Sequence, residues 1–278
     1  MNTARATAHA TASRAKNSKT MQILGRAGMI CYGVIHLLLA YLAIRVATGD
    51  KSEQADQKGA IQEVGSTAFG GFLLWVLGLG LIAYGAWQVL LAAKGFHWVD
   101  KKSKRTRKKI GAAARAVVGF SLGVTSIIYA VGSGSSSSSS SEQQKTMTAK
   151  LLALPAGPFL VGLVALVIIG VAVGTAVKGF RKSFEDDLDM ADLPRGTQQW
   201  VRRLGVVGYI AKGVTFFIVG ILIGTAAIQH DPDEAGGLDA ALKTLASQPF
   251  GTVALFVVAL GLAAYGVYCF AAAKAHKN

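Results

Sequence analysis

The sequence predicts an all-α membrane protein in which six transmembrane helices form three parallel two-helix repeats, with short amphipathic helices outside the membrane. Two observations carry this prediction. Of the 278 residues, 52% are hydrophobic and only 16% are charged, a composition too apolar for an ordinary water-soluble chain of this length. The apolar residues are also gathered in six uncharged runs, each at or above the about 18 residues that indicate a membrane-spanning helix.

These runs predict transmembrane helices over about 24–47, 70–93, 112–132, 155–177, 204–227 and 251–273. A helix of a soluble bundle would carry Lys or Glu on its outer face at every turn, and these segments do not. Strands of a transmembrane barrel would alternate polar and apolar residues, and this alternation is absent. All five prolines lie in connections or at helix starts, where a missing N–H costs little.

The remaining segments complete the predicted organisation. We expect a disordered basic cytoplasmic tail (1–21), a first repeat (22–95), a basic cytoplasmic loop (96–111), a second repeat (112–179), a cytoplasmic linker (180–203) and a third repeat (204–275). The Ser-rich external loop of the second repeat, 133–145, is too polar to pack and predicts a flexible linker. The stretches 59–71 and 236–251 predict short helices at the outer surface.

The basic residues predict the orientation of the chain. Most of the 29 Lys and Arg residues lie before the first helix, between the second and third, between the fourth and fifth, and after the sixth. By the positive-inside rule these segments face the cytoplasm. We therefore expect a multi-pass protein of the cell (inner) membrane with both termini cytoplasmic.

One of these segments, "KKSKRTRKK" at 101–109, suggests a partner. A basic cluster beside a membrane helix attracts anionic lipid headgroups. No aromatic residue is interleaved for base stacking, so we expect the lipid bilayer and its anionic lipids as partners and no nucleic acid.

Internal similarity divides the chain into copies. "LGRAGMICYG" (24–33) resembles "LGVVGYIAKG" (204–213), and "GLGLIAYG" (78–85) resembles "ALGLAAYG" (259–266). The middle third is a weaker copy, in which Gly123 is placed against Gly33 and Gly170 against Gly85. Each copy crosses the membrane twice, so all three have the same orientation.

This pattern resembles a known family. Three repeats, with an opening motif "LGVVGYIAKGV", a closing motif "LGLAAYGVY" and a lysine ending each unit, are similar to the actinobacterial membrane-protein family called domain of unknown function 1206. The likeness covers about residues 22–275, and the middle repeat departs from it most, with Ile169 at the position of the tyrosine. The resemblance implies a six-helix inner-membrane protein and brings no assigned activity.

The glycines raise the question of a nucleotide site. A dinucleotide fingerprint needs G-x-G-x-x-G in a turn after a strand, whereas 78–85 has G-x-G-x-x-x-x-G in mid-helix. Small residues in lipid let helices approach closely. We therefore predict helix-packing roles for Gly78, Gly80, Gly85, Gly119, Gly123, Gly170, Gly174, Gly220, Gly224, Gly261 and Gly266.

Few ionisable residues lie inside the spans. An intramembrane charge costs about 2.5–3.5 kcal/mol on insertion scales and indicates function by default. His36 and Lys212 are the candidate intramembrane polar site. The alternatives are a hydrogen-bonded core histidine and, for Lys212 and Arg45, side chains that extend to the membrane surface. A haem site would need a second intramembrane histidine, which the sequence lacks.

No arrangement of reactive residues predicts catalysis. The stretch 185–196 begins like a calcium loop but lacks the glycine and the terminal glutamate of that motif, so we expect it to pair with the basic 101–109 segment. We find no Ser–His–Asp set, paired intramembrane carboxylates or P-loop. We therefore expect no catalytic, cofactor-binding or metal-binding residues, no cofactor and no enzyme activity.

Three hypotheses of function follow. The leading one is a non-catalytic scaffold or accessory subunit that packs with membrane-protein partners. The second is a small-solute or ion transporter or channel with pseudo-three-fold symmetry, since three parallel repeats would surround an axis. The third is a membrane oxidoreductase or haem protein.

Overall fold

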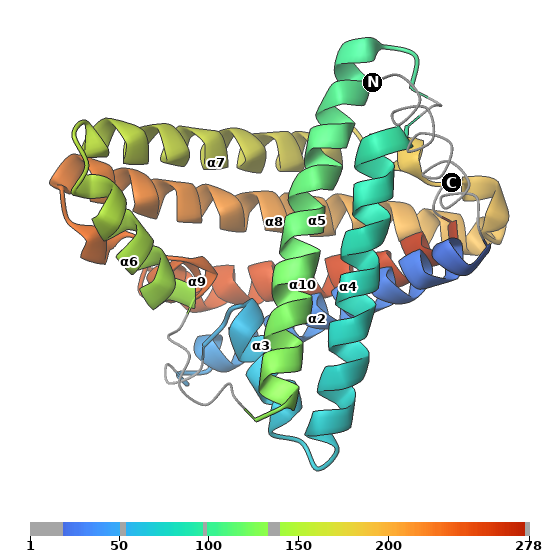
Figure 1. Cartoon of the computed structure of the whole chain (residues 1–278), viewed down its shortest axis with the longest axis horizontal. Coiled ribbons are helices and arrows are strands. Elements are labelled where there is room, and N and C mark those ends of the chain that lie inside the picture. Colours follow the sequence, from blue (N-terminus) through green and yellow to red (C-terminus); the bar gives the residue numbers. More distant parts are fainter. Residues whose placement is uncertain (1–18, 51–53, 97–98, 133–139, 276–278) are drawn as a thin grey trace, which may run out of the picture. The chain divides into compact units, whose positions relative to one another are not determined.

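The structure is a computed structural model that describes residues 19–50, 54–96, 99–132 and 140–275. In these ranges the chain is helical and contains no strand (Figure 1). The helices are α2 (Lys19–Ala47), α3 (Gln57–Gly65), α4 (Gly70–Lys94), α5 (Lys102–Ala130), α6 (Ser140–Leu152), α7 (Gly157–Phe180), α8 (Arg195–Gln229), α9 (Leu238–Ala246) and α10 (Gly251–Ala275). Three short 3-10 turns are η1 (Glu185–Asp187), η2 (Met190–Asp192) and η3 (Pro232–Glu234).

Six of these helices, α2, α4, α5, α7, α8 and α10, are long and apolar enough to cross a membrane. The predicted all-α membrane fold with six spanning helices is thus confirmed. Three helices begin earlier than expected: α2 starts at Lys19, α5 at Lys102 and α8 at Arg195. Lys, Arg, Ala and Gln are good helix formers, so each helix extends through part of a segment expected to be a tail, loop or linker. Residues 1–18 of the predicted tail lie outside the described residues, and 19–21 are helical.

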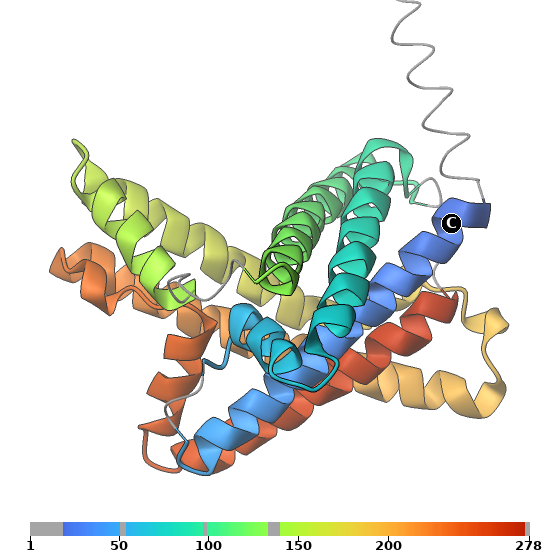
Figure 2. The same cartoon turned by 60° about the horizontal axis from the view of Figure 1, so that its bottom comes forward.

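The chain forms two compact units. Unit 1 comprises residues 1–32, 64–134 and 269–278, and unit 2 comprises 33–63 and 135–268. In unit 1, α4 and α5 lie side by side, and in unit 2, α7 and α8 do so (Figure 1). The parts of α2 and α10 that belong to unit 2 also lie side by side (Figure 2).

Glycines set the distances between helices in unit 1. A Cβ atom added to Gly28 of α2 would lie 2.5 Å from the backbone nitrogen of Tyr84 in α4. On another face of α4, a Cβ atom on Gly119 of α5 would lie 3.1 Å from the Cα of Gly85. These backbones therefore leave little or no room for a side chain at either glycine, as expected where small residues form the contact.

Unit 2 uses the same kind of contact. A Cβ atom on Gly213 of α8 would lie 2.9 Å from the carbonyl oxygen of Ala172 in α7. On the other side of α8, a Cβ atom on Gly208 would lie 2.6 Å from the Cα of Tyr265 in α10. Helix α8 thus packs between α7 and α10 through glycines.

One turn recurs before the second long helix of each repeat. The helices α4, α7 and α10 each begin at a glycine whose N–H donates to the carbonyl oxygen three residues earlier, at 2.8, 2.8 and 2.7 Å. A Cβ atom on Gly70, Gly157 or Gly251 would lie 2.2, 2.4 or 2.2 Å from a carbonyl oxygen at the end of the preceding short helix. The backbone of this turn therefore leaves no room for a side chain at its last residue.

All three repeats contain a short helix between their two long helices, namely α3, α6 and α9. The short helices predicted in the first and third repeats are present as α3 and α9. The flexible linker predicted over 133–145 is wrong for residues 140–145, which begin α6, and 133–139 lie outside the described residues. The glycine turn also fixes the alignment of the repeats: Gly85 and Gly266 correspond to Ala172, not to Gly170, and the tyrosine position falls at Val171, not at Ile169.

The recurring turn gives a test of stability. Gly251→Ala is expected to destabilise the protein by about 1–3 kcal/mol, because the added methyl group meets a backbone carbonyl that cannot rotate away. Gly71→Ala is the matched control, since a Cβ atom there has nothing within 4 Å among the described residues. The measurement is thermal unfolding in detergent, and equal melting temperatures for the two variants would contradict the described turn.

Candidate functional site

The structure brings together the two polar residues singled out in the spans. His36 lies on α2 and Lys212 on α8, and both belong to unit 2. The Lys212 Nζ atom is 3.4 Å from the Nε2 atom of His36. An ammonium group has only donors, so when Lys212 is charged the imidazole accepts through Nε2.

Tyr265 of α10 completes this cluster. The Lys212 Nζ atom lies 4.4 Å from the centroid of the Tyr265 ring, within the range of a cation–π contact. The centroid of the His36 ring is 4.7 Å from that of Tyr265, at an interplanar angle of 53°. We call His36, Lys212 and Tyr265 the polar cluster.

Glycine contacts create the space in which the polar cluster forms. Gly208, one turn before Lys212, brings α8 against the backbone of Tyr265. Gly266 brings α10 against α2, where its Cβ atom would lie 2.9 Å from the carbonyl oxygen of Gly33. Helices α2, α8 and α10 therefore meet near Tyr265, because Gly208 and Gly266 have no side chains to hold these helices apart.

The polar cluster is buried and lies deep in the spans. His36 is 4% exposed and Tyr265 6% exposed, whereas Lys212 is half-buried. His36 is near the middle of the apolar stretch Ile23–Ala47, and Tyr265 is near the middle of α10. The ammonium group of Lys212 is directed to these two residues.

The same position carries a different pair in the first repeat. Tyr84 corresponds to Tyr265, and Tyr32 corresponds to Lys212. In unit 1 the Tyr32 and Tyr84 rings stack with centroids 4.8 Å apart and an interplanar angle of 10°. At this position the first repeat has two stacked rings, whereas the third repeat has the Lys212 ammonium group over the face of the Tyr265 ring.

Aromatic and charged side chains continue from the polar cluster towards the end of α7. The Tyr209 ring meets the Tyr265 ring edge-on, with centroids 5.2 Å apart. On Tyr209 lies Lys178, whose Nζ atom is 4.9 Å from the ring centroid. Lys178 in turn is 3.4 Å from the Oδ2 atom of Asp187.

The segment between α7 and α8 folds back onto this end of unit 2. Phe184 is fully buried, stacks on Tyr209 and meets Tyr268 edge-on, both at 5.3 Å between centroids. Glu185 accepts two hydrogen bonds from the guanidinium of Arg202, at 2.8 and 2.9 Å. We call residues 181–194 the folded-back segment.

This geometry adds residues that the sequence analysis missed. In the acidic stretch 185–196, Glu185 and Asp187 pair with Arg202 and Lys178 of their own unit, and the expected pairing of this stretch with 101–109 stays a prediction. The predicted linker is therefore an ordered structure. Phe184 anchors the segment. In the sequence it lies in the mostly polar stretch "FRKSFEDD", and one apolar residue among polar ones does not predict a buried side chain.

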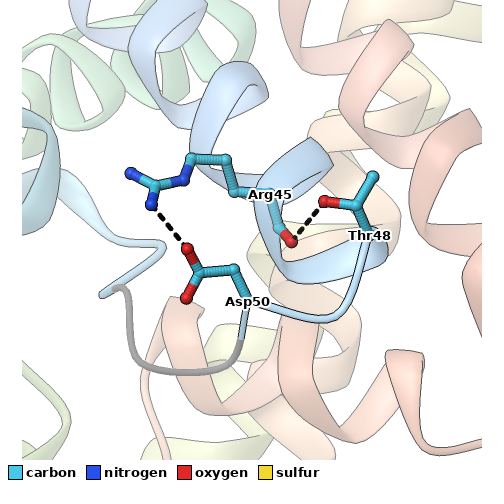
Figure 3. Close-up of polar contacts among 3 residues, drawn as sticks. All are labelled: Arg45, Thr48 and Asp50. Carbon is cyan, nitrogen blue, oxygen red and sulfur yellow. Dashed lines mark hydrogen bonds and ion pairs between the residues drawn. The ribbon is translucent and has the colours of Figure 1, made fainter.

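Arg45 has a local role at the end of α2. Its Nη2 atom is 2.5 Å from the Oδ2 atom of Asp50, and the Thr48 hydroxyl donates to the Arg45 carbonyl oxygen at 2.9 Å (Figure 3). The guanidinium carbon also lies 5.9 Å from the centroid of the Tyr41 ring. These contacts tie the turn after α2 to the helix.

The predicted packing glycines fall into three groups. Most of them approach another helix within their own unit, which holds for Gly78, Gly80, Gly85, Gly119, Gly123, Gly220, Gly261 and Gly266. At Gly224 a Cβ atom would make an ordinary contact, 3.7 Å from the Ala165 Cβ. A Cβ atom on Gly170 or Gly174 of α7 would have nothing within 4 Å among the described residues.

These features define a multi-pass helical membrane protein built from three repeats. The chain belongs to the family described as Domain of Unknown Function (DUF1206), whose profile matches residues 27–95, 110–182 and 207–276. The first two matches end at 95 and 182, the same separation as between Gly70 and Gly157 in the recurring turn.

A relative supports this membership. The "Uncharacterized protein YxxB" of Bacillus subtilis (strain 168) is 32% identical over 244 residues, which cover 88% of this chain and 87% of the relative. This relative comes from a Bacillus, so it does not support the actinobacterial origin that the resemblance implied. No solved structure matches the chain.

The folded-back segment gives a second test. Phe184→Ala is expected to lower the free energy of unfolding by about 3–5 kcal/mol, because it removes a fully buried ring and leaves a cavity. Phe180→Ala is the matched control, since Phe180 is 68% exposed. Thermal unfolding of both variants in the same detergent checks this, and a Phe184→Ala variant as stable as the control would show that the segment does not pack on the helices.

Proposed function

We propose that this protein is a non-catalytic scaffold or accessory subunit that packs against a transmembrane helix of another membrane protein. The supporting observation is one face of α7. That face carries Gly170 and Gly174, whose added Cβ atoms would meet nothing within 4 Å in the described part of the chain.

Helix α7 is the least covered of the six spans. Only 17% of its most apolar window is buried, compared with 33% or more for each of the others. On the same face as the two glycines lie Leu163, Val167 and Val177, which are 50%, 59% and 39% exposed. We call these five residues the open face of α7.

The chemistry of the open face favours a helix as its occupant. Lipid chains are as apolar as valine and leucine, so two helices in a membrane associate through close packing and not through the hydrophobic effect. A pair of glycines four residues apart forms a shallow groove into which another helix backbone fits. The partner is therefore a transmembrane helix that also presents small residues at the contact.

The described titratable side chains show how the acidic groups are placed. In residues 19–50, 54–96, 99–132 and 140–275, no three His, Cys, Asp or Glu side chains gather in a group suited to a metal ion. The carboxylates Glu185, Asp187 and Asp239 are engaged in ion pairs with basic residues.

The location that we propose is the cell membrane, with both termini in the cytoplasm. The distribution of Lys and Arg supports this orientation through the positive-inside rule. In the first turns of α5, Lys102, Lys104 and Arg107 are exposed. Side chains in this position can contact anionic lipid headgroups, each worth about 1 kcal/mol near the surface.

A second candidate function is ion or small-solute transport, and the polar cluster favours it. Ionisable residues inside a transmembrane bundle mark ion pathways and proton relays in many membrane proteins. Lys212 and His36 meet in this way near the middle of their spans.

Partner packing is tested by enlarging one glycine. In Gly174→Ile, the added branched side chain fills the groove, so recovery of the partner in a gentle detergent pull-down is expected to fall at least tenfold. Val171→Ile is the matched control, because Val171 is exposed at the flank of the open face.

A photo-crosslinking residue at position 170 identifies what lies on the face. Cross-links to a helix of one other membrane protein, lost in Gly174→Ile, support the proposal. Cross-links to a second copy of this chain alone, or recovery unchanged in Gly174→Ile, contradict it.

The orientation is tested with single cysteines in a chain whose Cys31 and Cys269 are replaced by alanine. Ser247→Cys, in the exposed turn before α10, is expected to react with a membrane-impermeant maleimide in intact cells. Lys104→Cys is expected to react only after the membrane is permeabilised. The reverse pattern would place both termini outside the cell.

A further inference from the structure

We propose that His36 and Lys212 form a proton-binding site inside the membrane, in which the two side chains exchange protons as one unit. This inference deepens the second candidate function, transport, by naming the proton as its ligand, and the site can be tested separately from transport. It is independent of partner packing on α7.

The supporting observation is the contact between the Lys212 Nζ and His36 Nε2 atoms. At 3.4 Å between Nζ and Nε2, no atom heavier than hydrogen fits between them. With Lys212 charged and His36 neutral, one N–H points along this line and the imidazole keeps its own proton on Nδ1. Moving the shared proton to Nε2 leaves a neutral amine and an imidazolium, with the same total charge.

Electrostatics couple the two groups. Two positive charges this close repel strongly in a medium of low dielectric constant, so the pair holds one positive charge more readily than two. Groups that interact in this way take up and release protons as a pair. At this distance an N–H of one nitrogen faces the lone pair of the other, so a proton can pass between them directly, and the observed geometry favours the proton as ligand.

The Tyr265 ring stabilises a positive charge on either Lys212 or His36. Its ring centroid is 4.4 Å from Lys212 Nζ and 4.7 Å from the centroid of the His36 ring. The negative face of an aromatic ring attracts a cation. The same ring therefore stabilises the ammonium form and the imidazolium form of the pair.

Titratable side chains also connect the polar cluster to one end of unit 2. In the described part of unit 2, the titratable groups in contact around it include His36 on α2, Lys212 and Tyr209 on α8, and Tyr265 and Tyr268 on α10. Beyond Tyr209, at increasing distance from the polar cluster, lie Lys178 and then Asp187. The outermost of these, Asp187, belongs to the turn η1 after α7.

The first experiment measures proton binding by His36 itself. The full chain is placed in lipid nanodiscs with ¹⁵N-labelled histidine, and His9, His97, His230 and His276 are replaced by glutamine so that only His36 reports. The imidazole nitrogens are followed through a pH titration in this background, in Lys212→Met and in Thr215→Val. Thr215 is the matched control, because it is buried on α8 and donates to the Ala211 carbonyl oxygen instead of to the polar cluster.

The expected result is an Nδ1-protonated, neutral imidazole at neutral pH and a proton affinity of His36 that changes at least tenfold in Lys212→Met. In Thr215→Val the affinity stays within twofold of the parent. Lys212→Gln is measured in parallel, so that a failure of Lys212→Met to insert leaves a second test. Equal affinities of His36 in the parent chain and in the inserted Lys212 variant would overturn the proposal.

A second measurement separates proton binding from transport. Proton entry into liposomes that contain the protein, driven by a potassium diffusion potential, is followed with an enclosed pH-sensitive dye. A rate that falls at least tenfold in His36→Gln supports both the site and the transport candidate. Coupled titration of His36 without any protein-dependent flux supports the site and removes transport.

Discussion

Close contact between helix backbones at glycines is the constraint on which the rest of the structure depends. In lipid, packing is gained only where two helices approach closely, and Gly28, Gly208 and Gly213 provide such points in their units. The contact at Gly208 has a chemical consequence, because it sets the ring of Tyr265 beside Lys212. A side chain at position 208 would separate the two helices and the residues of the polar cluster with them.

One packing position of the repeats has an aromatic partner in one copy and a charged partner in another. Tyr84 and Tyr265 occupy the same place in the first and third repeats, and each meets a residue of the first long helix of its own repeat. In one repeat that residue is Tyr32, which stacks on the ring, and in the other it is Lys212, which lies over the ring. A tyrosine face accepts either partner, so the two repeats differ in the chemistry of this position while the same two helices of the repeat meet there.

The sequence predicted the features that depend on local pattern. Uncharged runs of sufficient length identified the six spans, and glycine spacing excluded a nucleotide site. His36 and Lys212 could each be named, but not their contact, because the two residues are 176 positions apart in the chain. Helix α6 was missed because serine repeats suggest a linker, and the folded-back segment was missed because its stability comes from Phe184 packing on distant residues.

The most direct test of this account is the through-space contact between Lys212 Nζ and His36 Nε2, measured by solid-state NMR on ¹⁵N-labelled protein in lipid bilayers. We predict a nitrogen–nitrogen cross-peak after a long mixing time in the parent chain, as expected for atoms 3.4 Å apart, and its loss in Gly208→Leu. Absence of this cross-peak in the parent chain, or its persistence in Gly208→Leu, would contradict the claim that glycine contacts assemble the polar cluster.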